Sequence, residues 1–273
     1  MHQPHIAFIG GGNMATAMVS GLLKQGVPTS CIDVVEPFGE ARDRLQSQLG
    51  IAAQEAAGLF LSKADIVIWA LKPQSFKEAA QQNRFCKSDA LHISVAAGIP
   101  STSIAKWLGN EQVVRSMPNT PALIGEGITG LFARSTVSDV GRQHAERVVS
   151  GMGQFLWVSS EAQLDAVTAL SGSGPAYMFY LMEAMTAAGV DMGLDREQAY
   201  QLAVATFIGA GELARSSHEP PEILRQRVTS KGGTTHAAIT SMDASHIKDL
   251  FGQALHAAHR RAIEMGQEFG DAD

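Results

Sequence analysis

The chain has 273 residues, of which 45% are hydrophobic and 18% charged, a composition typical of a folded globular protein and not of a disordered or fibrous one. Its 21 basic and 27 acidic side chains give a formal net charge of −6, which excludes a general attraction to nucleic acid or to an anionic membrane surface. A small molecule is therefore the expected partner, and the length favours two domains.

Signals for export or membrane insertion are not evident in the sequence. The N-terminus lacks a basic stretch that leads into a long apolar run, and no run of about eighteen apolar residues occurs. The two cysteines, Cys31 and Cys86, lie outside any disulfide or metal-binding spacing. We therefore expect a cytoplasmic protein without membrane association, disulfides or a structural metal.

The first half of the chain alternates predicted strands with predicted helices. Strands are expected at residues 5–10, 31–36, 65–71, 91–98, 112–117, 128–133 and 154–158. Helices are expected at 13–26, about 40–50, after Pro73, from Ser101 and between the last two strands. This alternation is typical of a Rossmann-type, doubly wound and mainly parallel sheet with helices on both faces.

The second half of the chain is predicted to be helical throughout. From Glu161 onward the apolar residues recur every three or four positions, and no strand pattern is convincing. The predicted domains are therefore 1–160, which binds a dinucleotide, and 161–273, which is all-α and binds the substrate. The apolar faces of these helices exceed what a domain of this size can bury alone, which predicts at least a homodimer.

The stretch FIGGGNMATA near the N-terminus carries the first functional signal. Gly10, Gly12 and Ala15 follow a predicted strand and open a predicted helix, in the GxGxxA spacing of dinucleotide-binding proteins. Gly10 permits a tight turn and Gly12 lets the backbone approach a pyrophosphate, while the N–H groups at Asn13 and Met14 meet the anion. A tight turn without a ligand is the alternative, and the strand and helix around the motif favour nucleotide binding.

The residues after the second predicted strand leave the choice of dinucleotide open. Glu36 stands about where an acidic residue accepts hydrogen bonds from the ribose 2′-OH of NAD, and its charge would repel the 2′-phosphate of NADP. Arg42 and Arg44 lie within two helical turns and could reach such a phosphate, although a solvated helix face explains them more simply. We expect NADH to work at least comparably to NADPH.

Motifs along nearly the whole chain resemble those of pyrroline-5-carboxylate reductases. In order they are GGGNMA, ALKPQ (70–74), AAGI (96–99), RSMPNTPALIGEG (115–127), LSGSGPAY (170–177) and VTSKGGTT (228–235). The resemblance implies that the cyclic imine 1-pyrroline-5-carboxylate is reduced to L-proline with NAD(P)H, at the final step of proline biosynthesis. It also implies dimers with intertwined helices, which in this family can stack into decamers.

The resemblance assigns cofactor contacts beyond the glycine fingerprint. Those at the ends of two predicted strands are Leu71, Lys72, Pro73, Ala96, Ala97 and Gly98. Asn119 lies between the two prolines of MPNTP, and its amide is expected to face the nicotinamide. An ordinary strand-end turn is the alternative at each of these places.

The stretch TSKGGTT suits the substrate carboxylate. Gly232 and Gly233 free successive backbone N–H groups for an anion, and the hydroxyls of Ser230 and Thr234 stand beside them. Thr235 begins a predicted helix whose positive end adds to the site. It also matches the family position whose hydroxyl hydrogen-bonds the ring nitrogen, which makes it the expected catalytic residue, with a plain helix N-cap as the alternative role.

Three other functions stay open at this stage. A β-hydroxyacid dehydrogenase shares the architecture, but the predicted helix after SGSGPAY lacks the lysine that such an enzyme needs. A related imine reductase for another ring and a non-enzymatic NAD(P)-sensing protein also fit the sequence. No metal is expected, because His256 and His259 have neither a third ligand nor an HExxH pattern.

Overall fold

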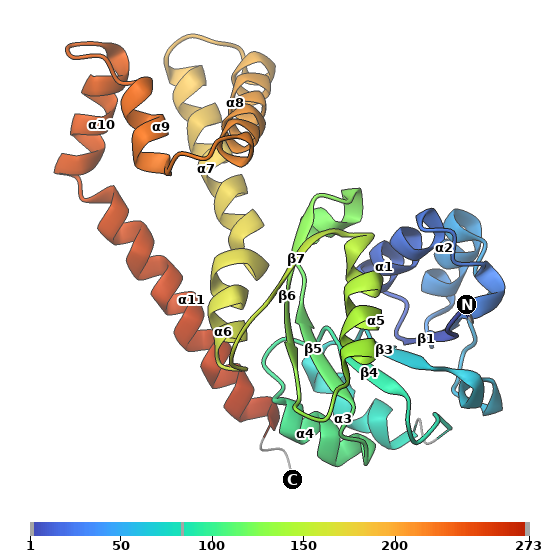
Figure 1. Cartoon of the computed structure of the whole chain (residues 1–273). Coiled ribbons are helices and arrows are strands. Elements are labelled where there is room, and N and C mark those ends of the chain that lie inside the picture. Colours follow the sequence, from blue (N-terminus) through green and yellow to red (C-terminus); the bar gives the residue numbers. More distant parts are fainter. Residues whose placement is uncertain (1–2, 83–84, 271–273) are drawn as a thin grey trace. The chain divides into compact units, whose positions relative to one another are not determined.

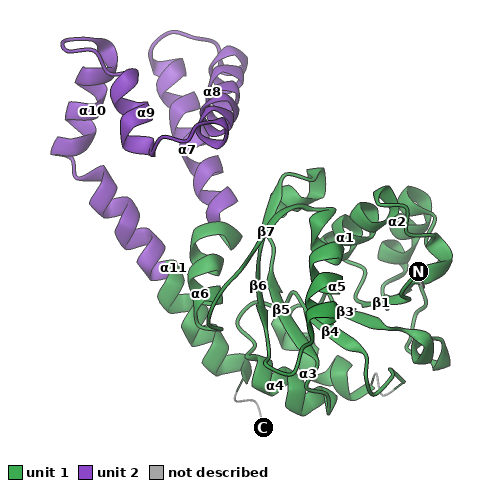
Figure 2. Ribbon diagram, in the orientation of Figure 1, with its two compact units in different colours: residues 1–173, 258–273 green, residues 174–257 purple. Residues whose placement is uncertain are grey.

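The chain folds into two compact units (Figure 2). The computed structural model describes residues 3–82 and 85–270. Unit 1 comprises Met1–Ser173 and Ala258–Asp273, and unit 2 comprises Gly174–Ala257. The last helix, α11 (Ile247–Gly270), begins in unit 2 and ends in unit 1. The sequence predicts a domain boundary at residue 160, where strands give way to helices. The two units, by contrast, are separated by how compactly their residues pack, so the predicted boundary stays a prediction.

Unit 1 is built on a seven-stranded sheet (Figure 1). Its strands are β1 (Ile6–Ile9), β2 (Ile32–Val35), β3 (Ile66–Trp69), β4 (Leu91–Ser94), β5 (Val113–Met117), β6 (Gly127–Ala133) and β7 (Gly153–Trp157). The strand order is β2-β1-β3-β4-β5-β6-β7, and of the six strand pairs β5 with β6 alone is antiparallel. The predicted fold class and its seven strands are confirmed.

Both faces of the sheet are buried along β1, β3 and β4, whereas the edge strand β7 is largely exposed. Along β1, Ile6 and Phe8 belong to one apolar cluster, while Ala7 and Ile9 belong to the other. Continuous apolar strands of this kind are typical of parallel sheets that are covered on both sides. The helices of unit 1 ahead of α11 are α1 (Asn13–Lys24), α2 (Gly39–Leu49), α3 (Pro73–Gln82), α4 (Ser101–Leu108), α5 (Asp139–Ser150) and α6 (Gln163–Val167).

Short helical segments complete the described part of unit 1. Three are 3₁₀ helices, η1 (Thr29–Cys31), η2 (Leu59–Lys63) and η3 (Thr120–Ile124). The fourth, η4 (Thr168–Gly172), is a π-helix directly before the first helix of unit 2. Single π turns of this kind are frequent at functional sites.

Unit 2 consists of helices in its described residues, as the sequence predicts. They are α7 (Gly174–Asp191), α8 (Arg196–Ser216), α9 (Pro221–Arg227), α10 (Thr234–Ala244) and the first part of α11. α7 and α8 approach closely, because a Cβ atom added at Gly189 would lie 2.8 Å from the Cβ of Ala199. Within the residues described, no helix is long and apolar enough to cross a bilayer.

Candidate active site

The carboxyl ends of three neighbouring strands meet at one edge of the sheet. β1, β2 and β3 end level, because Ile9, the last residue of β1, pairs with Val35 and Trp69, the last residues of β2 and β3. The turns after these strands therefore lie side by side. Ligands of open α/β sheets bind at this carboxyl edge, where strand order reverses.

Gly10 follows β1 at a point where no side chain fits. Its φ is +99°, and an added Cβ would lie 2.5 Å from the carbonyl oxygen of Ala70. Its N–H donates to the carbonyl of Val35 at 2.8 Å, which joins the ends of β1 and β2. The turn is as tight as the sequence predicts, and glycine is required for it.

Gly12 lies in open space at the start of α1. It is the N-cap residue, it is exposed, and nothing lies within 4 Å of a Cβ added there. The first helical hydrogen bond runs from the Thr16 N–H to the Gly12 carbonyl, so the N–H groups before Thr16, including those of Asn13 and Met14, are left for another acceptor. No acidic residue stands in this first turn, so the helix end can receive a phosphate anion.

The middle glycine of the motif, Gly11, holds the carboxylate of Glu36. The Gly11 N–H donates to Glu36 Oε2 at 2.7 Å, and the Phe38 N–H donates to Oε1 at 2.9 Å. Glu36 is 6% exposed. A Cβ at Gly11 would lie 2.7 Å from Leu45 Cδ1, so this glycine is needed for packing. The GxGxxA spacing did not point to Gly11, although three glycines in succession were a signal.

Two adjoining clefts of about 790 and 500 Å³ open at this edge of unit 1. Both are lined by Gly10, Glu36, Phe38, Leu71 and Ser75. Gly12, Lys72 and Arg44 line the larger cleft as well. Pro73, which follows Lys72 in the chain, is the first residue of α3. Cavities of this size are typical of sites for small molecules and cofactors. Most of the residues predicted from the first three strands are thus brought to one place, and Phe38 and Ser75 are additions that the sequence did not indicate.

Carboxylates dominate the charged lining of the two clefts. The acidic side chains are Glu36, Glu40, Glu55 and Glu78, and the basic ones are Arg44 and Lys72. The two arginines of α2 differ in what they contact.

Arg42 is engaged within the protein. Its guanidinium donates to the carbonyls of Glu36 and Pro37 at 2.9 and 2.7 Å and pairs with Glu55 at 3.5 Å. Arg44 lines the larger cleft and makes no ion pair with the residues that the structure describes. Arg44, and not Arg42, is thus the cation available to a phosphate in the cleft.

The predicted residues from β4 and β5 lie beyond these clefts. Ala96 and Gly98 are buried, and Ala97 between them is half-buried. Asn119 uses both ends of its amide: Oδ1 accepts from the Ile128 N–H at 3.0 Å, and Nδ2 donates to Ser171 Oγ at 3.1 Å. Asn119 therefore joins the segment after β5 to the start of β6 and to the π-helix η4, a structural role that the sequence did not indicate.

A partly buried ion pair borders the segment after β4. Glu161 Oε1 accepts from the Ser101 N–H at 2.5 Å and from Arg115 Nη1 at 2.9 Å, and Oε2 accepts from Ser101 Oγ at 2.7 Å. Burial raises the pKa of Glu161, but the hydrogen bonds from Ser101 and Arg115 and the charge of Arg115 outweigh it, so this pKa lies below its usual value. Glu161 therefore stays ionised and keeps Ser101 in place.

Nearby, Asp165 has a different electrostatic environment. Burial raises its pKa above the usual value, against the opposing charges of Arg115 and His259. Arg115, Glu161 and Asp165 line a pocket of about 270 Å³, together with Gly98 and residues of α11.

In unit 2, the stretch TSKGGTT forms the start of α10. Gly233 is the N-cap residue, and its N–H donates to the carbonyl of Ser230 at 3.0 Å. The first helical hydrogen bond runs from the Ala237 N–H to Gly233, so the N–H groups of Thr234, Thr235 and His236 are left for another acceptor. The predicted substrate residues are thus brought together around one helix end.

The alternative role of Thr235 as a helix cap is wrong. Thr235 is the second residue of α10, because the helix begins at Thr234 with Gly233 as its cap, and no side chain caps this helix end. Its side chain is half-buried. The threonine is therefore not required to start the helix.

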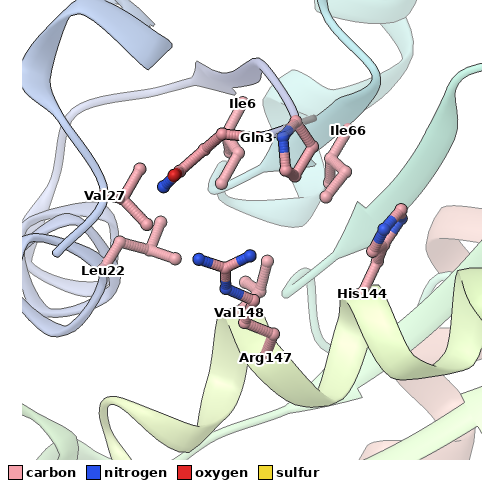
Figure 3. A pocket seen from close by; sticks show the side chains of 9 residues that line it. Gln3, Ile6, Leu22, Val27, Ile66, His144, Arg147 and Val148 are labelled. Atoms are coloured by element: carbon pink, nitrogen blue, oxygen red, sulfur yellow. The ribbon is translucent and has the colours of Figure 1, made fainter. Parts of the chain in front are cut away.

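Other places in the described residues offer less. A cavity of about 10 Å³, lined mainly by apolar side chains with His144 and Arg147, holds at most a water molecule (Figure 3). Among the residues that the structure describes, no group of three His, Cys, Asp or Glu side chains could hold a metal ion.

The fold and the carboxyl-edge clefts of unit 1 define the class: a Rossmann-type NAD(P)-dependent oxidoreductase with a helical second part. Residues 5–98 match the family model for NADP oxidoreductase, coenzyme F420-dependent, and residues 161–265 match the model for pyrroline-5-carboxylate reductase dimerisation.

Full-length relatives narrow this class. The pyrroline-5-carboxylate reductase of Pseudomonas aeruginosa is 45% identical over 99% of this chain and 100% of its own. Among solved structures, the Coxiella burnetii pyrroline-5-carboxylate reductase is 38% identical with a TM-score of 0.90, over 97% of this chain and 99% of its own. The Plasmodium falciparum pyrroline carboxylate reductase, solved with NADP bound, is 25% identical with a TM-score of 0.86 over the same shares. The chain belongs to the pyrroline-5-carboxylate reductase family, and it is an NAD(P)H-dependent oxidoreductase.

Proposed function

We propose that this chain reduces 1-pyrroline-5-carboxylate to L-proline, at the final step of proline biosynthesis. The observation that carries the proposal is the 45% identity to a pyrroline-5-carboxylate reductase over the whole length of both chains. The open phosphate-binding turn at Gly12 and the free N–H groups of α10 supply the two anion sites that the reaction needs, one for the cofactor and one for the substrate carboxylate.

The proposed cofactor site lies in unit 1. Bound NAD(P)H supplies the hydride for the C=N bond. The pyrophosphate lies on the turn of Gly10 and Gly12 and on the N–H groups of Asn13 and Met14. Three groups of side chains complete the site, namely Glu36, then Leu71, Lys72 and Pro73, and then Ala96, Ala97, Gly98 and Asn119.

The cofactor preference that we propose is NADH at a rate at least comparable to NADPH. Glu36 is fixed by the N–H groups of Gly11 and Phe38, and each carboxylate oxygen can accept a further hydrogen bond from a ribose hydroxyl. The charge of Glu36, with Glu40 in the same cleft, disfavours a 2′-phosphate. Arg44 opposes this preference, since it lines that cleft, as Lys72 does, and makes no ion pair with the residues that the structure describes.

The proposed substrate site lies at the start of α10 in unit 2. The substrate carboxylate is bound at Gly232 and Gly233, with the hydroxyls of Ser230 and Thr234 beside it. The Gly233 N–H itself is used by the Ser230 carbonyl, so the donors that follow this cap are the N–H groups of Thr234 and Thr235. The hydroxyl of Thr235 bonds the ring nitrogen and orients the imine carbon toward the hydride. As hydride adds to the carbon of the protonated imine, the electron pair of the C=N bond moves to nitrogen and cancels its positive charge, so a contact to that atom changes in strength during the reaction.

The working form that we propose is a cytoplasmic homodimer, which in this family can stack into a decamer. The dimerisation model matches residues 161–265, and unit 2 exposes large apolar side chains. Its partners are the substrate, the product proline and a second copy of the chain, without nucleic acid or membrane.

An assay of imine-dependent cofactor oxidation tests this function. Purified protein is mixed with NADH or NADPH and 1-pyrroline-5-carboxylate, and both cofactor loss and proline formation are measured. Turnover with this imine and much slower turnover with six-membered cyclic imines supports the proposal. Preference for another ring would identify a related imine reductase, and cofactor binding without turnover would identify an NAD(P)-sensing protein.

A further inference from the structure

The segment between β4 and α4, residues 95–100, lies directly against the last turns of α11 in unit 1. Gly98 has a φ of +81°, and a Cβ added there would lie 3.1 Å from Met265 Cβ and 3.2 Å from the Gly266 nitrogen. Conversely, a Cβ added at Gly266 would lie 3.0 Å from the Gly98 oxygen. The backbones of the segment and the helix therefore touch, and they do so because both positions are glycine.

A second glycine of α11 extends this contact by one helical turn. A Cβ at Gly270 would lie 2.6 Å from Pro100 Cδ, and the Gly270 carbonyl accepts from Ser103 Oγ at 2.8 Å. Residues four apart lie on the same face of a helix, so Gly266 and Gly270 present one face without side chains. The segment after β4 packs on that face.

The other end of the segment is fixed by a different residue. Glu161 accepts hydrogen bonds from both the N–H and the hydroxyl of Ser101, and Arg115 holds Glu161 in turn. The segment therefore has two supports, one from α11 and one from Glu161. Figure 2 colours the end of α11 with unit 1, to which all of these residues belong.

We propose that Gly266 is a positioning residue for hydride transfer. By letting α11 touch Gly98, it fixes the place of Ala96, Ala97 and Gly98, and these residues set where the nicotinamide ring lies. This inference rests on the proposed function, which puts the three residues against the nicotinamide. A displacement of a few tenths of an ångström matters, because hydride transfer depends steeply on the distance and alignment of the reacting atoms.

The test compares the binding of NADH with the binding of ADP, which keeps the adenosine and pyrophosphate but lacks the nicotinamide. Gly266→Ala adds one methyl group against the Gly98 carbonyl and moves the segment. NADH affinity and kcat should each fall about tenfold, while ADP affinity should stay as in the wild type. A residue with a merely structural role would lower the melting temperature without changing the ratio of NADH to ADP affinity.

The matched control is Gly252→Ala in the same helix, where an added Cβ meets nothing within 4 Å. It should leave the ratio unchanged. If Gly266→Ala does not fold, Ser103→Ala removes the bond to Gly270 without adding atoms, and it should change the ratio in the same direction by about twofold.

A further variant separates failure of this inference from failure of the proposed site. Ala97→Leu adds bulk on the half-buried side chain of the segment itself. A changed ratio in Ala97→Leu with an unchanged ratio in Gly266→Ala and Ser103→Ala would overturn the positioning role and leave the site assignment intact. An unchanged ratio in all three variants would overturn the assignment of Ala96, Ala97 and Gly98 and the inference with it.

Discussion

Units 1 and 2 differ most in what they bury. In unit 1 the fully buried side chains include Trp69, Phe8 and Phe76, each 0% exposed. In unit 2, by contrast, large apolar side chains such as Phe179 and Met192 are 58% and 79% exposed. The buried residues of α7 and α8 are small: Thr186, Gly189, Ala199 and Ala203.

This difference separates the sources of stability in the two units. Burial of apolar surface contributes about 25 cal/mol per Å², so the two-sided core of unit 1 can stabilise it without a partner. Unit 2 leaves many large apolar side chains exposed, and a second copy of the chain is the proposed cover. The unfolding of unit 2 should then depend on protein concentration, whereas that of unit 1 should not.

The largest effect is expected when a charge is placed on the apolar surface of unit 2. Phe179→Glu should weaken the proposed homodimer by about 100-fold or more, because a carboxylate without a partner is costly to bury. Light scattering across a range of protein concentrations measures the change. The control is Leu59→Glu in unit 1, at a side chain that is 78% exposed, and it should leave assembly unchanged. A wild-type protein that is a stable, active monomer at micromolar concentration would contradict the comparison.

The second effect concerns the interior of unit 1. His92 is buried in β4 and accepts a hydrogen bond from Trp69 Nε1 at 3.1 Å, and burial lowers its pKa to about 4 from the usual 6.5. Below pH 6.5 the unfolded chain binds a proton at His92 that the folded chain does not bind. Stability should therefore fall as the pH drops from about 6.5 to about 4, by about 3 kcal/mol in total.

His92→Gln tests this source of acid sensitivity. The free energy of unfolding, measured by denaturant titration, should vary less between pH 6.5 and pH 4 in the variant than in the wild type. The histidines of unit 2 (His218, His236, His246 and His256) are exposed, so His246→Gln serves as the control. Equal pH dependence in wild type and His92→Gln would show that other groups govern acid unfolding.

The two units were also unequally predictable from the sequence. Strands such as β1 and β3 are short apolar runs, IAFI and IVIW, because both of their faces are buried, and their parallel order places the turns after them at one edge. The tight turn at Gly10 follows from this local pattern. The bond from Gly11 to Glu36 and the contact between Gly98 and Gly266 do not, since each depends on the packing of residues far apart in the chain. The alternative N-cap role of Thr235 is wrong, because α10 begins one residue earlier than the sequence indicated and Gly233 takes the cap.

A smaller effect on stability, with a clear effect on turnover, is expected at the start of α10. Thr235→Ala should slow turnover by about ten- to a hundredfold, equivalent to about 1.4 to 2.7 kcal/mol of barrier, because it removes the hydroxyl that we propose to orient the imine. The melting temperature should change little, since Thr235 does not cap the helix. Thr235→Ser keeps the hydroxyl and should restore most of the rate. Wild-type turnover in Thr235→Ala would refute the catalytic role.

The smallest expected effect is a change of cofactor preference at Glu36, and it contrasts with Thr235 because Glu36 also supports the fold. Glu36→Ser removes one of the carboxylates that line the clefts, so the ratio of kcat/KM for NADPH to that for NADH should rise several-fold, by roughly 1 kcal/mol. The same change removes the acceptor for the Gly11 and Phe38 N–H groups, so the melting temperature should fall as well.

Arg44→Ala should shift the preference in the opposite direction, because Arg44 is the cation available to a 2′-phosphate. Glu40→Ser is the control for charge alone, since Glu40 lines the same cleft and is exposed. If Glu40→Ser and Glu36→Ser change the preference equally, the field of the carboxylates selects the cofactor. If Glu36→Ser alone changes it, a direct contact to the ribose selects the cofactor, which is the result that we expect.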